Sequence, residues 1–406
     1  MGQMSSCETK LTQEEIREAQ DLKDRVENEG PEAIAKHVRE NLDRWKKEEL
    51  KIGISGRIKT GKSTFINAVL GLRPNQPGSA KSGSGNTTQN VTTYAHPRNK
   101  QIVLFDFPGV GTEDHPKSKY MTKVNTSECD YFLIFFDSVI SDDDIWLAER
   151  LKEINKPYCF VRSMIDQDIQ NAEFDGKNSD TVLEEVRENV QTSVAANNIT
   201  RHSSIFFISG RYTDIGEFPQ LLTHMEKNIS SLKFESILFS ISAISKEVIE
   251  KKYQKLKSRI RIVSVGAAAI SAEPIPIIDL LININLLIHE LHHYIDTFGI
   301  TMDKIESLPA EVKERLNVWS ILTKSGKALV VFIIQQIEKA AAVAVVESVA
   351  DFFIPIIGSL ISAPTTYFIV KDFLTKYLDQ MKEDAIIVYD NVLHAQKHLH
   401  TDTQVC

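Results

Sequence analysis

The chain carries LKIGISGRIKTGKSTFIN at residues 50–67, and this stretch decides the fold. Apolar residues alternate with smaller or polar ones over 50–55, which predicts a strand. A glycine-bounded loop, GRIKTGKS, follows at 56–63, and apolar residues at helical spacing begin at Phe65. Strand, loop and helix in this order are the context in which the G-x-x-x-x-G-K-S pattern binds phosphate.

Each motif residue has a chemical reason to be there. Gly56 and Gly61 let the backbone curl so that its N–H groups point inward, and the helix N-terminus adds partial positive charge. We expect Lys62 to act catalytically by reaching the β- and γ-phosphates, and Ser63 to ligate Mg²⁺. The nucleotide-binding residues predicted here are Gly56, Lys59, Thr60, Gly61, Lys62, Ser63 and Thr64.

A polar, glycine-rich segment follows at residues 74–93. In nucleotide switches, such a segment supplies a threonine that closes over Mg²⁺ and the γ-phosphate. We select Thr88 as this catalytic and metal-binding residue, with Thr87 and Thr92 as alternatives. A surface loop with no bound state is the simpler interpretation.

The next buried strand, 101–106, ends in the sequence DFPGVG. Asp106 is predicted to hold Mg²⁺ through water, and Gly109 to offer its N–H to a γ-phosphate. Proteins of the Ras type orient the attacking water with a glutamine after this glycine. Here the residue is Val110, so hydrolysis is expected to be slow or to need groups from a second molecule.

Two later strand ends carry base-recognition patterns. Asp166 stands where guanine-specific proteins place the Asp of Asn/Thr-Lys-x-Asp, and its carboxylate can accept hydrogen bonds from guanine N1 and N2. Met164 replaces the lysine, so a thioether can pack on the purine without a charge. Ser209 and Gly210 follow the last strand and are expected near guanine O6. Asp166 as a simple helix cap remains the alternative.

Composition narrows the function classes further. The chain has 406 residues, with 42% hydrophobic and 25% charged residues, which suggests two to three domains. A net charge of −8 gives no case for nucleic acid as a main partner. The four cysteines have no metal or disulfide spacing, so we expect reduced thiols and a cytoplasmic protein. No secretory leader is visible at the N-terminus.

The chain begins MGQMSSC, which fits N-myristoylation at Gly2, with Cys7 as a possible acylation site. A flexible terminus that happens to begin Met-Gly is the alternative. One myristoyl chain gives only weak, reversible membrane binding, so a second contact would be needed.

Both ends of the chain have helical patterns. Residues 11–49 read as two helices, and residues from 234 to the end are helical throughout. Apolar segments at 262–288 and 328–370 contain prolines and charges, so buried hairpins are favoured over membrane-inserting elements. The predicted domains are N-terminal helices 1–49, a nucleotide-binding domain 50–232 and a C-terminal helical domain 233–406.

The sequence HELHH at 289–293 matches the H-E-x-x-H zinc pattern on a helix. No third ligand stands out, and the chain already has a complete nucleotide site. We therefore interpret this segment as an amphipathic helix with its polar residues on the outer face, and not as a zinc protease.

Together these motifs resemble those of the immunity-related GTPases, the interferon-inducible p47 family, over nearly the whole chain. The residues that carry the resemblance are the Met-Gly start, 56–63, 80–83, 106–111, 217–219 and the paired Ile-Pro-Ile segments of the helical half. Because it carries Lys62, the chain resembles the Gly-Lys-Ser members of the family rather than the Gly-Met-Ser regulators.

The resemblance implies an α/β P-loop, Ras-like G domain with a mostly parallel sheet, inserted in an all-α domain built from both chain ends. It also implies GTP or GDP with Mg²⁺ as cofactors, GTP-dependent dimers or oligomers, and peripheral association with intracellular membranes during innate defence. Met164 replaces the family's usual lysine and Ser163 its threonine, and both changes bear on nucleotide affinity. Asn86 stands where the family usually carries a glutamate, and this change bears on catalytic rate.

Two other function classes stay open at this point. One is a GTP-binding regulatory scaffold with negligible hydrolysis and a non-immune role. The other is an ATP-using P-loop enzyme, against which the Asp166 match argues.

Overall fold

The computed structural model describes residues 13–81, 91–111, 115–124, 126–176, 178–195, 197–212, 214–242, 245–271, 278–348 and 363–402. The chain forms two compact units. The sheet unit comprises Trp45–Val248, and the helical unit comprises residues up to Arg44 together with those from Ile249 on. Predicted residues Gly2, Asn86, Thr87 and Thr88 lie outside the described residues.

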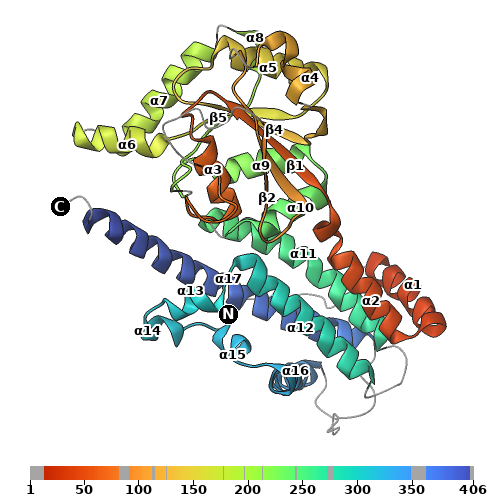
Figure 1. Ribbon diagram of the computed structural model, residues 1–406. Helices are drawn as coiled ribbons and strands as arrows, with labels where there is room; N and C mark the ends of the chain where they lie inside the picture. Colours follow the sequence, from red (N-terminus) through yellow and green to blue (C-terminus); the bar gives the residue numbers. More distant parts are fainter. Residues whose placement is uncertain are drawn as a thin grey trace, which may run out of the picture. The chain divides into compact units, whose positions relative to one another are not determined.

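The sheet unit is built on one six-stranded sheet of order β2-β3-β1-β4-β5-β6 (Figure 1). Every neighbouring pair is parallel except β2 with β3. The strands are β1 (Leu50–Gly56), β2 (Thr92–Ala95), β3 (Ile102–Asp106), β4 (Tyr131–Phe136), β5 (Tyr158–Arg162) and β6 (Ile205–Phe207). The predicted mostly parallel sheet is confirmed.

Helices connect the parallel strands, and two more, α9 and α10, follow the last strand. They are α3 (Lys62–Leu70), α4 (Lys117–Val124), α5 (Asp142–Glu153), α6 (Ile165–Phe174), α7 (Ser179–Val194), α8 (Asn198–Arg201), α9 (Phe218–Asn228) and α10 (Ser231–Ser240), with 3-10 turns at Arg44–Lys47 and Thr126–Glu128. Strands that run parallel need such crossovers, which is why helix and strand alternate.

The central strand β4 shows why the sheet is covered on both faces. Its sequence YFLIFF is apolar throughout, as expected when neither face meets water. Phe132 and Phe136 join the core that includes α5. The alternate residue Phe135 packs instead against Phe65 of α3, with ring centroids 5.2 Å apart. Successive side chains thus serve opposite layers.

The helical unit contains the chain's two ends. Its helices are α1 (Gln13–Glu29), α2 (Pro31–Leu42), α11 (Lys246–Ile270, of which the residues up to Val248 fall in the sheet unit), α12 (Ile278–Phe298), α13 (Met302–Glu306), α14 (Ala310–Lys313), α15 (Trp319–Leu322), α16 (Gly326–Ser348) and α17 (Ala363–Asp402). Helix α12 packs against both α2 and α17, so N-terminal and C-terminal segments share one bundle (Figure 1). The all-α part predicted from both ends is confirmed.

Close packing of α2 and α11 depends on Gly266. A Cβ on this residue would lie 2.6 Å from Cγ2 of Val38. Nearby, the buried Arg259 guanidinium donates to both carboxylate oxygens of Glu290, at 2.7 and 2.9 Å, and to the carbonyl oxygen of Leu42 at 2.6 Å. This fork ties α11, α12 and the end of α2 together.

The same ion pair explains the HELHH segment. Glu290, its central carboxylate, is fully buried and held by Arg259, while His289 Nε2 lies 3.2 Å from Asp43 Oδ2. The described residues include no group of three or more His, Cys, Asp or Glu side chains placed to hold a metal ion. The expectation of polar residues on the outer face is wrong for Glu290 and His293, which are both buried in the helical unit.

Helix α10 belongs to the sheet unit. Its Phe239 ring lies edge-on to Trp45, with centroids 5.3 Å apart, and its Ser236 Oγ accepts a 2.9 Å hydrogen bond from Asn99. The predicted domain limits at residues 50 and 232 stay a prediction. The compact sheet unit runs from Trp45 to Val248. Across the described ranges, no helix is both long and apolar enough to span a bilayer.

Candidate guanine nucleotide site

The phosphate loop runs between the end of β1 at Gly56 and the start of α3 at Lys62. Gly56 has a φ of 139°, and a Cβ there would lie 2.1 Å from the carbonyl oxygen of Phe135. Gly61 has a φ of 82°, and its Cβ would lie 2.7 Å from Ser163 Oγ. Glycine is required at both positions because a side chain would be strained and would also meet a neighbour.

Lys62 folds back across this loop. Its Nζ donates to the carbonyl oxygens of Gly56 and Arg57, at 2.7 and 2.8 Å. Burial lowers the pKa of Lys62, while the negative charges of Asp106 and Asp144 act to raise it. The ammonium is thus already placed over the loop where phosphates would enter.

The remaining predicted loop residues have different surroundings. Thr60 is buried, and its hydroxyl donates to the carbonyl oxygen of Arg57 at 2.9 Å. Lys59 is exposed, with a positive φ of 69°. Ser63 is half-buried in the first turn of α3, and Thr64 lines a pocket next to the loop.

The candidate metal ligands come from neighbouring elements. Asp106 ends β3 and pairs in register with Ile54, two residues before the phosphate loop begins. Its carboxylate and the Ser63 hydroxyl are hard oxygen donors of the kind Mg²⁺ prefers, so the residues present fit that ion. Thr88 lies outside the described residues. Its rival Thr92 opens β2 and is the cross-strand partner of Asp106.

A buried tyrosine joins the loop after β3 to β1. Tyr120 of α4 donates a 2.8 Å hydrogen bond to the carbonyl oxygen of Pro108, and its Oη lies 3.3 Å from Ser55 Oγ. Burial raises the pKa of Tyr120, so the hydroxyl keeps its proton and remains a donor. The neighbouring Gly109 is half-buried, where a γ-phosphate is predicted to meet its N–H.

The residue after Gly109 points into the protein. Val110 is 9% exposed and belongs to the apolar core shared with α5. Beyond it, Gly111 has a φ of 81° and approaches the Asp143 carboxylate so closely that a Cβ would lie 2.6 Å from Oδ2. Lys117 holds that carboxylate at 2.8 Å. The valine therefore anchors this loop and offers no polar group to water.

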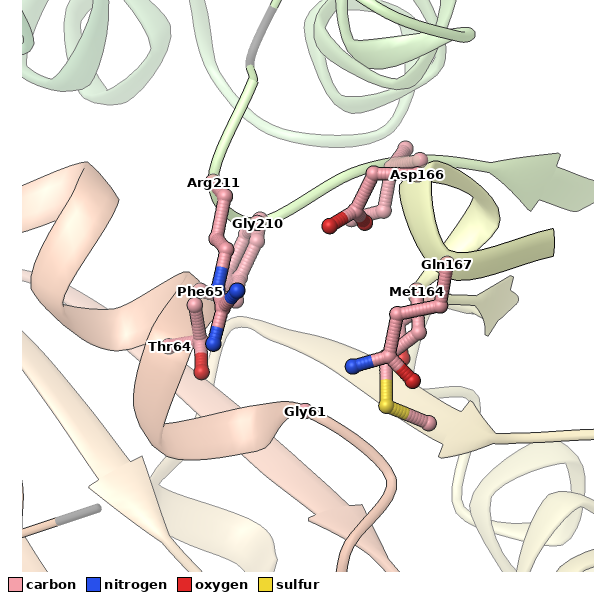
Figure 2. A pocket seen from close by; sticks show the side chains of 10 residues that line it. Gly61, Thr64, Phe65, Met164, Asp166, Gln167, Gly210 and Arg211 are labelled. Atoms are coloured by element: carbon pink, nitrogen blue, oxygen red, sulfur yellow. The ribbon is translucent and has the colours of Figure 1, made fainter. Parts of the chain in front are cut away.

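A pocket adjoins the phosphate loop (Figure 2). Asp166, in the first turn of α6, turns its carboxylate toward this space, and Met164 flanks it with a left-handed φ of 60°. The pocket is lined by Gly61, Thr64, Phe65, Ser163, Met164, Asp166, Gln167, Ile208, Gly210 and Arg211. Phosphate-loop residues and the predicted base-reading residue thus share one pocket.

The loop that carries Asp166 is tied down on two sides. The Ser163 hydroxyl donates to the carbonyl oxygen of Thr60, which joins it to the phosphate loop. The Arg162 guanidinium donates to the carbonyl oxygen of Ser163 and, at 2.7 Å, to Asp168 Oδ2. These bonds fix the backbone from which Asp166 is presented.

The loop after β6, which is expected to lie near the guanine base, is closed by Glu217. Its carboxylate accepts from the Phe207 backbone N–H at 3.0 Å and from Arg187 at 2.8 Å. Ser209 is buried, and its hydroxyl accepts from the backbone N–H groups of Arg211 and Tyr212. Gly210 reaches the pocket lining, whereas Ser209 supports the loop behind it.

The family model that matches this chain is the interferon-inducible GTPase (IIGP) model, over residues 15–392. The chain belongs to the interferon-inducible GTPase family. Family membership confirms the resemblance noted from the motifs, together with GTP binding, GTPase activity and an innate-immune class.

Curated relatives agree with this membership. The GTPase is 27% identical over 361 residues to interferon-inducible GTPase 5 of Rattus norvegicus, covering 86% of this chain and 77% of the relative. It is 29% identical over 282 residues to interferon-inducible GTPase 1 of Mus musculus, covering 68% and 67%. Among solved structures, Era bound to MgGDPNP and 16S ribosomal RNA matches at 20% identity and a TM-score of 0.32, covering 52% of this chain and 68% of Era.

The sequence motifs do not mark several residues of this candidate site. Gln167 and Arg211 line the pocket, and Tyr120 and Arg162 hold the loops from behind. Arg211 directly follows the predicted Gly210, so its position in the sequence was the available signal. Tyr120 acts on Pro108 from another element, and no local pattern marks such a contact.

Proposed function

We propose that this GTPase binds GTP and GDP in the pocket between the phosphate loop and the Asp166 loop. The observation that carries the proposal is the shared pocket, in which Gly61 and Asp166 both line the wall. Loop amides and Lys62 would take the phosphates, and the Asp166 carboxylate would accept from guanine N1 and N2. Mg²⁺, held by Ser63 and Asp106, would neutralise phosphate charge.

Hydrolysis by a single copy is expected to be slow. Val110 is packed in the core and has no group that could orient water. We propose that a second copy completes the site when two nucleotide faces meet. Support comes from two exposed apolar side chains near the carboxyl edge of the sheet, Ile58 at 50% and Val139 at 57% exposure.

The test is GTP turnover per molecule measured against protein concentration. We expect turnover to rise with concentration for the wild type, and to stay flat for Val139→Asp, which lies outside the phosphate loop, because a charge on that face opposes pairing. A matched change at an exposed residue of the helical unit, Val331→Asp, should leave the concentration dependence intact. Flat wild-type turnover would contradict assembly.

A GTP-binding scaffold is the second candidate, favoured by the same burial of Val110. It predicts tight GTP binding with background turnover at every protein concentration. The concentration series described above therefore separates the two functions in one experiment.

The proposed function also includes membrane association. We propose a cytoplasmic protein that is acylated at Gly2 and peripherally bound to intracellular membranes, with self-association supplying the second contact that one acyl chain needs. Co-expression with an N-myristoyltransferase and vesicle flotation test this. Gly2→Ala should abolish flotation, and equal flotation of both proteins would contradict acylation as the anchor.

A further inference from the structure

Asn67 of α3 is a buried polar residue to which no motif assigns a role. Its side chain is 3% exposed, and it holds the backbone of Ala80, which is buried completely. The Ala80 N–H donates to Asn67 Oδ1 at 2.6 Å, and Asn67 Nδ2 donates to the Ala80 carbonyl oxygen at 2.9 Å. Buried backbone groups need partners, and this one carboxamide supplies both.

The two bonds need an amide side chain. A carboxamide carries an acceptor and a donor side by side, whereas an ionised carboxylate has only acceptors. An ionised aspartate in place of Asn67 would keep the bond from the Ala80 N–H, but it would set a negative oxygen against the Ala80 carbonyl. The side chain therefore recognises this peptide group and does more than fill space.

Asn67 shares a face of α3 with the candidate metal ligand Ser63. The two residues are four apart in the helix, and residues at that spacing lie one above the other on one face. Ser63 belongs to the first turn, which adjoins the phosphate loop, and Asn67 follows one turn later. The backbone that Asn67 holds is therefore held one helical turn from the candidate Mg²⁺ ligand.

The peptide held in this way belongs to the predicted switch segment, residues 74–93. Ala80 precedes Thr88, the predicted threonine ligand of Mg²⁺, in the chain. Beyond that threonine, Thr92 pairs in register with Asp106, the second candidate metal ligand. Ala80 and Thr92, on either side of Thr88 in the sequence, are thus both attached to elements that carry candidate metal ligands.

We propose that Asn67 is a positioning residue for GTP hydrolysis. By holding Ala80, it sets the point from which the chain runs to Thr88, so that this threonine can reach Mg²⁺ and the γ-phosphate. The inference rests on the guanine nucleotide site proposed above, and it adds a residue that acts through another and touches no ligand. A threonine in this role contacts the triphosphate state, so the loss of Asn67 should affect GTP more than GDP.

The first test compares the full-length wild type with Asn67→Ala. The probes are GDP and β,γ-imido-GTP, a GTP analogue that resists hydrolysis, both with Mg²⁺. We expect affinity for the analogue to fall about 10-fold or more, and GDP affinity to change less than about 3-fold. GTP turnover at a fixed protein concentration should fall with the analogue affinity. Equal losses for both nucleotides would overturn the proposal, because a fault in the fold of α3 affects both.

Asn99→Ala is the matched control in the sheet unit. Asn99 is also buried and lies outside the pocket lining. Its Nδ2 donates to Ser236 Oγ at 2.9 Å, and its Oδ1 accepts from the Gln101 N–H at 3.1 Å. Its loss should lower the melting temperature without a selective effect on the analogue. The same selective loss in the control would overturn the inference, since general destabilisation would then explain it.

A second variant, Asn67→Asp, uses the chemistry of the carboxyl group. The introduced group offers an acceptor and an O–H donor, as the amide does, only while it is protonated. Burial raises the pKa of such a group, so protonation is within reach of mildly acidic pH. Selectivity for the analogue over GDP, divided by that of the wild type at the same pH, should therefore approach the wild-type value as pH falls. A ratio that stays low at every pH would overturn the proposal.

Failure of the inference can be told from failure of the proposed function. A wild type that binds neither nucleotide overturns the nucleotide site, and the inference with it. A wild type that binds both nucleotides, while Asn67→Ala keeps its selectivity and its GTP turnover, overturns the inference alone.

Discussion

Gly61 is the residue at which the phosphate loop meets the base loop. Its left-handed backbone begins α3, and a Cβ on it would lie 2.7 Å from the Ser163 hydroxyl, which donates to the carbonyl oxygen of Thr60. A change at this one position should therefore disturb phosphate and base recognition together.

Gly61→Ala is expected to destabilise the sheet unit and to weaken GDP binding. Alanine at positive φ costs about 1–2 kcal/mol, and the contact with Ser163 adds about 1 kcal/mol or more. Gly176→Ala is the matched control, because Gly176 has a φ of 73° but nothing within 4 Å of its Cβ. Thermal unfolding should show a smaller loss for the control. Equal losses would mean that the close approach is unimportant.

The pKa of Lys62 leads to a pH dependence. Burial lowers that pKa below its ordinary value of 10.5, so Lys62 loses its proton at a lower pH than an exposed lysine. GTP affinity that depends on the ammonium should fall as pH rises through the lowered pKa. Titrating affinity from neutral to alkaline pH checks this, and the fall should begin at a lower pH than in Lys62→Arg, in which only the loss of the guanine N1 proton remains. The same fall in both proteins would exclude Lys62 as its cause.

At the scale of elements, the loop after β3 is held by the two α-helices that follow it in the chain, α4 and α5. Tyr120 of α4 bonds the carbonyl oxygen of Pro108, and Val110 is buried against α5. The loop that would sense the γ-phosphate is thus coupled to α4, whose movement could report the nucleotide state.

Tyr120→Phe should cost about 1–3 kcal/mol of folding free energy, because the buried Pro108 carbonyl loses its donor. GTP turnover should fall as the loop loses its anchor. Tyr158→Phe is the control, since the Tyr158 hydroxyl is 3.1 Å from Ser203 in a part-buried place outside the pocket. Chemical denaturation and turnover measure the two effects. Similar behaviour of both variants would contradict the coupling.

Helices α11 and α12 depend on the buried Arg259–Glu290 pair. Arg259→Met should destabilise the helical unit by about 3–5 kcal/mol, because it leaves Glu290 buried without a partner, and adding Glu290→Leu should recover most of the loss. Arg261→Met removes an exposed pair with Glu18 and should cost about 1 kcal/mol or less. In the nucleotide-free protein, where the proposed Mg²⁺ site makes no contribution, a chelator should leave unfolding of the wild type unchanged. Lower stability with the chelator would revive a metal role for Glu290.

At the scale of the whole molecule, the fold class and family followed from local patterns. The strand, loop and helix around Lys62 are contiguous, so their order could be read from sequence and is confirmed by the sheet and the family match. The Arg259–Glu290 pair spans 31 residues, and the Tyr120 hydroxyl reaches β1 from α4. Contacts of this kind depend on packing between elements and leave no local pattern in the sequence.

The pocket could be predicted only in part, for the same reason. Asp166 and Gly210 follow strand ends, where the carboxyl edge of a parallel sheet gathers ligand-binding residues. Arg162 supports the Asp166 loop through its hydrogen bond to Asp168. That bond depends on where α6 packs, which no local sequence pattern shows. The burial of Val110 likewise became visible only with the core around it.

The central claim is that the Asp166 carboxylate selects guanine in this pocket. Xanthine carries an oxygen where guanine has its N2 amino group, and an asparagine offers one acceptor and one donor in place of two acceptors. The most direct test is therefore the ratio of GDP to xanthosine diphosphate affinity for the wild type and for Asp166→Asn. The account predicts that the wild type prefers GDP and that the variant reverses the preference. A variant that keeps wild-type affinity for GDP would contradict it.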